Sequence, residues 1–237
     1  MVNFDGKQVL VVGGSSGIGE AAARAFVERG ATVTIVSRDS GKLAASAARI
    51  GQGVLTGVMD ITDEASVRAF LDGAGEFDHV VVSAAQTATG PVRGLELKDA
   101  QAAMDSKFWG AYRVARAARI REGGSLTLVS GFLSVRPSSS SVLQGAINAA
   151  LEALARGLAL ELSPVRVNTV SPGMIATPLW SKLDEAAREK MYAGAAARLP
   201  ARRVGQPEDV ANAIVYLAAT PYATGSTVLV DGGGAIA

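Results

Sequence analysis

The chain contains no cysteine and a single histidine, His79, among its 237 residues. The lack of cysteine excludes disulfide bonds, zinc–thiolate sites and thiol catalysis. Charged residues make up 19% of the chain, and the net charge of +1 provides no basic surface for nucleic acid or an anionic membrane. No apolar run is long enough to span a membrane, and the first residues lack a basic region followed by an apolar stretch. We therefore expect a cytoplasmic globular protein that acts on a small molecule, with no membrane or nucleic-acid partner and no metal.

Hydrophobic residues are plentiful, at 49% of the sequence, and many occur in short runs typical of buried strands. Alanine-rich stretches with helical spacing, such as Ala65–Leu71 and Ala149–Glu161, separate these runs. This alternation predicts an α/β fold of one domain, residues 1–237, with a Rossmann-like doubly wound parallel sheet of about seven strands and helices on both faces. The expected strands are Gln8–Val12, Thr32–Val36, Gly53–Val58, His79–Ser83, Ser125–Ser130, Arg166–Val170 and Thr227–Val230.

A glycine-rich turn joins the first expected strand to the first expected helix. Gly13 would let the chain turn sharply, Gly17 would let the backbone approach a pyrophosphate, and Gly19 would let helix and strand pack closely. The start of the helix would present free N–H groups and the positive end of its dipole to phosphates. This order of strand, turn and helix predicts a dinucleotide site.

Four segments in order resemble blocks of the short-chain dehydrogenase/reductase family, and the resemblance covers essentially the whole chain. They are Val12–Gly19, Val165–Gly173, Arg203–Ala211 and Val230–Gly233. The family normally has Asn-Asn-Ala-Gly where this chain has Ser83-Ala84-Ala85-Gln86. The resemblance implies cofactor binding by Gly13, Ser15, Ser16, Gly17, Ile18, Gly19, Ser37, Arg38, Asp60, Ile61, Ser83, Ala84, Ala85, Pro172, Gly173, Ile175 and Thr177.

The end of the second strand bears on the choice of cofactor. NAD enzymes commonly carry an acidic residue about 20 residues past the glycine turn, where it binds the ribose 2′-hydroxyl. This chain has Ser37 there, followed by Arg38 and Asp39. A guanidinium can bind a 2′-phosphate through two hydrogen bonds, so the pattern favours NADP(H). Alternatively, Arg38 is a solvated surface residue and Asp39 serves NAD. Asp60 either flanks the adenine, as in the family, or caps a helix.

The catalytic positions of the family are not matched. The family places Tyr-x-x-x-Lys on one helix, and the alignment of the following segment puts Gln144 at the tyrosine and Asn148 at the lysine. Gln144 has no proton to exchange near neutral pH, and Asn148 carries no charge. The family's catalytic serine falls on Gly131, which leaves Ser130 and Ser134 as nearby candidates. Ser130 could equally be a strand-end serine bonded to backbone.

A lysine stands where the family has an asparagine. Lys107 and Asn148 look like an exchange of those two residue types between two helices that face one cavity. Lys107 could therefore bring a positive charge into the nicotinamide cleft, or could instead extend to the surface. We name Lys107, Ser130, Gln144 and Asn148 as candidate catalytic residues.

Three functions remain open from the sequence. The first is an NADP(H)-dependent reductase of a small carbonyl, imine or conjugated acceptor with altered acid chemistry. The second is a nucleotide-binding sensor or partner subunit without redox chemistry, and the third is a non-redox enzyme that reuses the cleft. Residues 178–199 resemble the family's mobile substrate lid, which contains Tyr192. The helices expected around Lys107–Arg119 and Asn148–Leu162 resemble those of a four-helix contact, so we expect a homodimer or homotetramer.

Overall fold

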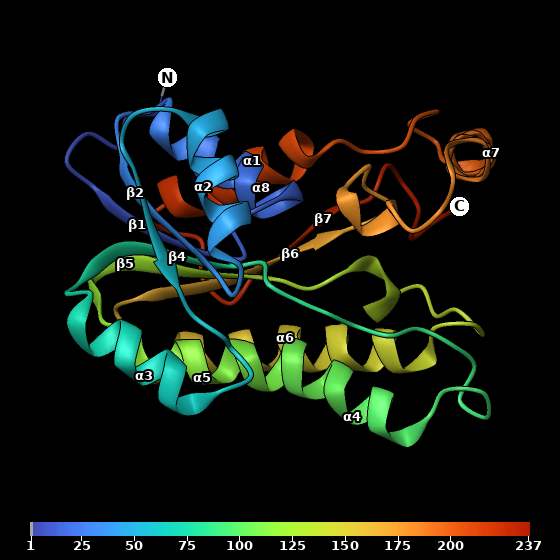
Figure 1. Ribbon diagram of the computed structural model, residues 1–237, viewed down its shortest axis with the longest axis horizontal. Helices are drawn as coiled ribbons and strands as arrows, with labels where there is room; N and C mark the ends of the chain where they lie inside the picture. Colours follow the sequence, from blue (N-terminus) through green and yellow to red (C-terminus); the bar gives the residue numbers. More distant parts are fainter. Residues whose placement is uncertain (1) are drawn as a thin grey trace.

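The computed structural model describes residues 2–237. Seven strands form one parallel sheet in the order β3-β2-β1-β4-β5-β6-β7 (Figure 1). The chain winds outward from β1 in both directions, which confirms the predicted doubly wound, Rossmann-like sheet. The strands are β1 (Gln8–Val12), β2 (Thr32–Ser37), β3 (Val54–Val58), β4 (Phe77–Val82), β5 (Ile120–Val129), β6 (Arg166–Pro172) and β7 (Thr227–Val230).

Helices cover both faces of the sheet (Figure 1). Their bounds are α1 (Gly17–Val27), α2 (Ser40–Ile50), α3 (Glu64–Gly73), α4 (Leu97–Met104), α5 (Gly110–Ala117), α6 (Val142–Glu161), α7 (Glu185–Arg198) and α8 (Pro207–Ala219). A π-helical turn, η1 (Asp105–Trp109), joins α4 to α5, and short 3-10 turns form η2 (Phe132–Ser134) and η3 (Pro178–Trp180).

The two hydrophobic cores follow from the alternation of side chains along the strands. In β1, Val9 and Val11 pack with α1 and α8 on one face, whereas Leu10 and Val12 pack with α5 and α6 on the other. These residues are all buried, as expected for a central parallel strand covered on both sides. Within residues 2–237, no helix is both long and apolar enough to cross a bilayer.

Several expected strand ends differ from the observed ones by one or two residues, and three elements differ in ways that have a visible cause. Strand β5 begins at Ile120 rather than Ser125, because Ile120 pairs with Phe77 ahead of an irregularity in the ladder. The expected helix over Lys107–Arg119 starts with a π-helical turn and ends at Ala117, which leaves Arg119 outside it. Helix α6 begins at Val142, two turns before the alanine-rich segment that predicted it.

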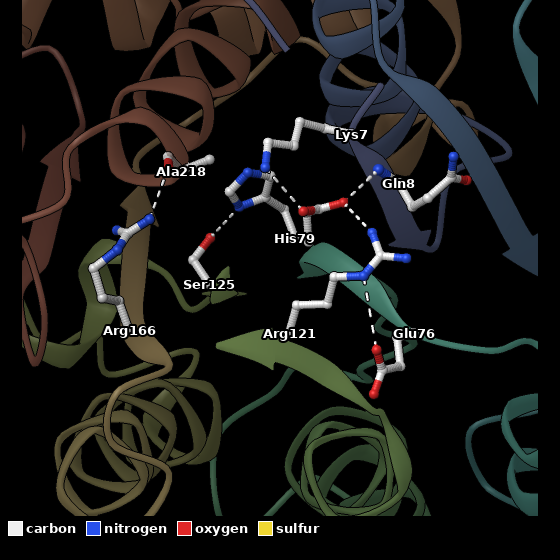
Figure 2. Close-up of polar contacts among 9 residues, drawn as sticks. Lys7, Gln8, Glu76, His79, Arg121, Ser125, Arg166 and Ala218 are labelled. Atoms are coloured by element: carbon white, nitrogen blue, oxygen red, sulfur yellow. Dashed lines mark hydrogen bonds and ion pairs between the residues drawn. The ribbon is translucent and has the colours of Figure 1, made fainter. Parts of the chain in front are cut away.

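A polar network lies at the amino ends of β1 and β4 (Figure 2). Asp78 accepts hydrogen bonds from the Gln8 amide at 2.8 Å and from Arg121 Nη1 at 2.8 Å, and it pairs with Lys7 Nζ at 3.1 Å. Its neighbour His79 is buried, with Nδ1 2.9 Å from Ser125 Oγ. Ligands of doubly wound sheets bind at the opposite, carboxyl ends, so this network has a structural role.

Candidate active site

The glycine turn lies at the carboxyl end of β1. Gly13 has φ +88° and donates its amide to Val36 O of β2 at 2.8 Å. A Cβ at Gly13 would lie 2.6 Å from the Ala84 amide nitrogen, so only glycine allows the turn to pass this close to the end of β4. The turn therefore stays free of side chains on the side that faces the β4 loop.

Helix α1 begins directly after this turn. Its N-cap residue Ser16 has an extended backbone, and among residues 2–237 no side-chain capping bond from Ser16 is formed. The first amides of α1 are therefore left for another acceptor, and the dipole of an 11-residue helix favours an anion there. Gly19 lies close to the Gly13 carbonyl, which brings the helix start against the strand.

Arg38 follows β2 and lies beside the loop after β4. It is exposed, and its Nη2 donates to Gln86 Oε1 at 2.8 Å.

Asp60, after β3, accepts from the Thr62 amide at 2.9 Å and from Thr62 Oγ1 at 2.8 Å. Burial opposes ionisation of Asp60, but the Thr62 hydrogen bonds and the charges of Arg38 and Arg113 hold its pKa below the ordinary value. Asp60 does not cap α3, since Asp63 occupies that position.

Lys107, on the π-helical turn, is buried and does not extend to the surface. Its Nζ donates to Ser130 O at 2.7 Å and to Asn148 Oδ1 at 2.6 Å, so η1, the end of β5 and α6 meet at this ammonium group. Asn148 is buried as well. The structure thus brings together three of the four candidate catalytic residues.

Burial of Lys107 lowers its pKa to about 8, against an opposing effect of the Glu152 charge, which raises it. An ordinary lysine stays charged up to about pH 10.4. Lys107 is therefore a group that can lose its proton close to neutral pH.

The fourth candidate, Gln144, lies one turn before Asn148 on α6. Its Oε1 is buried and, within residues 2–237, has no hydrogen-bond partner. A buried amide oxygen without a donor is unfavourable, by about 1–3 kcal/mol. A ligand that carries an O–H or N–H group would satisfy it.

Glu152 is the residue that sequence reasoning missed. It lies one turn after Asn148 on α6 and is only 8% exposed. Its Oε1 accepts from Ser130 Oγ at 2.9 Å and from Ser134 Oγ at 2.7 Å. The spacing Gln144, Asn148, Glu152 places these residues at i, i+4 and i+8 on one stripe of the helix, which was the available signal.

Gly131 makes room for the amide of Asn148. A Cβ at residue 131 would lie 2.7 Å from Asn148 Nδ2, closer than real Cβ contacts allow. A side chain at residue 131 would therefore force a shift of the Asn148 amide, whose Oδ1 accepts from Lys107. Ser130 directly precedes this glycine and Ser134 follows three residues later. Both serine hydroxyls donate to Glu152 Oε1.

The segment after β6 brings further predicted residues to the same edge of the sheet. Pro172 ends β6, and the Gly173 amide donates to Val230 O at 3.0 Å. Thr177 directly precedes η3, and a Cβ at Gly17 would lie 3.3 Å from the Thr177 side chain, so this loop faces the start of α1. Tyr192 is half-buried on α7 and lines a shallow pocket of about 430 Å³ together with Arg203 and Val204.

A family model described as Enoyl-(Acyl carrier protein) reductase matches residues 12–234. A short-chain dehydrogenase/reductase of Stachybotrys chlorohalonatus is 31% identical over 98% of this chain and 98% of its own length. The chain belongs to the short-chain dehydrogenase/reductase family. It is thereby assigned to a family of oxidoreductases, in agreement with the Rossmann-type sheet.

Two solved structures of short-chain dehydrogenases extend the comparison. A small-chain dehydrogenase in complex with NADPH is 33% identical, with a TM-score of 0.83 over 98% of this chain and 100% of its own. An NADPH-bound short chain oxidoreductase from Pseudomonas aeruginosa, described as containing an atypical catalytic center, is 28% identical. Its TM-score is 0.92, over 99% of this chain and 98% of its own.

Proposed function

We propose that this short-chain dehydrogenase/reductase is an NADP(H)-dependent reductase in which Lys107 supplies the proton that the family takes from tyrosine. The observation that carries the proposal is the buried Lys107 ammonium, 2.6 Å from Asn148 Oδ1 and 2.7 Å from Ser130 O. Its substrate would be a small carbonyl, imine or conjugated acceptor.

The residues at the carboxyl edge fit a dinucleotide. The side-chain-free turn at Gly13 and the uncapped start of α1 provide the close backbone approach and the N–H groups that a pyrophosphate needs. Thr177 lies across from Gly17. It resembles the family residue that binds the carboxamide of the nicotinamide. When bound, the nicotinamide supplies the hydride.

Preference for NADP(H) over NAD(H) rests on Ser37 and Arg38. An acidic residue at Ser37 would repel a 2′-phosphate, whereas the Arg38 guanidinium is exposed and beside the end of β2. Its one hydrogen bond, to Gln86, is at the surface and can be exchanged for a phosphate oxygen at little cost.

The chemistry proposed for Lys107 follows from its hydrogen bonds. An ammonium group has three N–H donors, and two of them are held by Ser130 O and Asn148 Oδ1. The third can donate to a substrate atom or to a water that bridges to it. A general acid works best when its pKa is near the working pH, and burial brings the Lys107 pKa to about 8. Gln144 and Asn148 stand where the family has tyrosine and lysine, and Gln144 would orient the substrate.

The test is a screen for NADPH oxidation against ketones, imines and enones, followed by Lys107→Met on any acceptor that reacts. We expect Lys107→Met to lose about 10²–10⁴-fold in kcat, the usual contribution of a general acid. Turnover of the unsubstituted protein should decline as pH rises above about 8, because the donor loses its proton there.

Lys98→Met is the matched control, because Lys98 is an exposed lysine on the preceding helix, α4. It should leave turnover unchanged. Full turnover in Lys107→Met would reject the catalytic role. Binding of NADPH without turnover of any acceptor would favour the nucleotide-binding protein without redox chemistry.

A further inference from the structure

Glu152 is a buried carboxylate that the proposed reaction does not yet use. Among the charged groups of residues 2–237, Glu152 is the one whose charge raises the Lys107 pKa. The acidic residue on Lys107's own turn, Asp105, is instead paired with Arg113 at 2.7 Å. Ser130, directly after β5, and Ser134 of η2 are uncharged.

We propose that Glu152 is a positioning residue for Lys107: it fixes the Ser130 segment that holds the ammonium group and supplies the negative charge that balances it. This inference rests on the proposed function of Lys107. Residue 152 would then be as necessary to this active site as the residues that face the substrate.

Glu152 positions Lys107 through Ser130, which is hydrogen-bonded to both residues. Ser130 donates its hydroxyl to Glu152 Oε1 at 2.9 Å, and its carbonyl accepts from Lys107 Nζ at 2.7 Å. Ser134 Oγ, 2.7 Å from the same carboxylate oxygen, secures η2 in the same way. Without Glu152, the Ser134 hydroxyl would lose its acceptor and the Ser130 hydroxyl would keep only its longer bond to Val170 O at 3.4 Å, so the loop around Gly131 would lose its anchor.

The charge balance follows from burial. A cation removed from water without a compensating charge is strongly unfavourable, and neither Asn148 nor a backbone carbonyl carries a full charge. Glu152, on the same helix as Asn148, provides one across Ser130. Because both charges are shielded from solvent, their attraction is screened less than that of a surface pair.

One experiment measures the pH dependence of kcat/KM in Glu152→Gln, with Glu161→Gln as the matched control on the exposed end of the same helix. We expect Glu152→Gln to move the alkaline limb to lower pH by about one unit, the size expected from loss of a nearby opposite charge. Glu161→Gln should leave the limb near pH 8. Glu152→Asp, which keeps the charge but shortens the reach to the serines, should keep the limb and lower kcat.

A second experiment needs no turnover. Urea unfolding of Lys107→Met, Glu152→Gln and the double variant at pH 7 forms a double-mutant cycle. Each single variant leaves one buried charge unbalanced, so the double variant should unfold at a higher urea concentration than additive losses predict. The pair Lys107→Met and Glu161→Gln should be additive.

The two experiments separate the two proposals. Additive losses in the Lys107–Glu152 cycle would overturn the role of Glu152, even if Lys107→Met abolished turnover. An alkaline limb that did not move in Glu152→Gln would do the same. Should Glu152→Gln not fold, Glu152→Asp tests the role through kcat, and a kcat equal to that of the unsubstituted protein would overturn it. Full activity of Lys107→Met would instead reject the proposed function.

Discussion

We predict that cofactor choice depends on Arg38. Arg38→Ala removes the guanidinium proposed to bind the 2′-phosphate, so NADPH affinity should fall by about 1.5–3 kcal/mol, the range for a charged hydrogen-bonding group. NADH affinity should stay nearly constant, because that cofactor has no phosphate at this position. Calorimetric titration of both cofactors measures the difference.

Gln86→Ala is the control for Arg38, since it removes the partner of the guanidinium but leaves its charge. It should keep the preference for NADPH. Equal affinities for NADPH and NADH in the unsubstituted protein would show that Ser37 and Arg38 do not set the choice.

His79 makes stability depend on pH. Burial, with a further contribution from the Arg166 charge, lowers its pKa from 6.5 to about 4. The unfolded chain takes up the proton first as the pH falls, so stability should decrease between about pH 6.5 and pH 4, by about 3 kcal/mol. His79 is the only histidine, and the lowered pKa of Asp78 acts at lower pH.

Urea unfolding at a series of pH values measures this effect. His79→Gln keeps a polar group near Ser125 but does not titrate, so its stability should be flat over the same interval. An equally steep loss in His79→Gln would assign the effect to other groups.

At the scale of the elements, one arginine closes the end of a helix. Arg166, at the start of β6, is buried, and its guanidinium donates to Leu217 O at 2.6 Å, Ala218 O at 2.7 Å and Thr220 O at 2.9 Å. Leu217 and Ala218 belong to the last turn of α8, whose carbonyls lack helical partners, and Thr220 directly follows the helix. A cation is favoured at a helix C-terminus. Figure 2 shows the guanidinium directed at Ala218.

Arg166→Met should therefore lower the free energy of unfolding by about 3 kcal/mol or more, because it leaves buried carbonyls without donors. Arg166→Lys keeps the charge with fewer donors and should lose less. The urea midpoint measures both. A loss in Arg166→Met no larger than that in Arg166→Lys would show that the charge contributes nothing to the end of α8, and no loss in Arg166→Lys would show that the charge alone is enough.

The same elements show what sequence patterns can and cannot predict. Strand β1 and its glycine turn were predicted correctly because a continuous apolar run followed by glycines has few other interpretations. The start of β5 was missed because Arg121, Glu122 and two glycines look like a loop, although Ile120 pairs with β4. The contact of Lys107 with Asn148 was anticipated because Lys107 stands where the family has an asparagine and Asn148 stands where it has a lysine. Glu152 was not, because a single acidic residue on an alanine-rich helix is normally solvated.

At the scale of the molecule, the outer surface of η1, α5 and α6 exposes large apolar side chains. Trp109 is 46% exposed, Tyr112 40% and Leu160 83%. Trp109 stands edge-on to both Phe108 and Tyr112, with ring centroids 5.2 and 5.6 Å apart. Helices α5 and α6 both lie below the sheet in Figure 1. Such a surface is typical of an interface between copies of a chain.

We therefore expect a dimer or tetramer at micromolar concentration, measured by light scattering. Leu160→Glu should shift the protein to smaller species, because it places a charge in that interface. Leu55→Glu is the control, since Leu55 is exposed on the edge strand β3. A monomeric unsubstituted protein would contradict the expectation.

The close approach of Asn148 to Gly131 has a consequence for how this active site can evolve. Because a Cβ at residue 131 would lie 2.7 Å from Asn148 Nδ2, we expect the effects of substitutions at the two positions to be coupled. A serine at 131 would require the Asn148 amide to shift, and loss of that amide would remove one of the two acceptors of the Lys107 ammonium. A path that changes only these two positions would therefore pass through an intermediate in which one of these contacts is disturbed. That barrier would preserve the arrangement in a lineage once it had arisen, whatever substrate the lineage came to use.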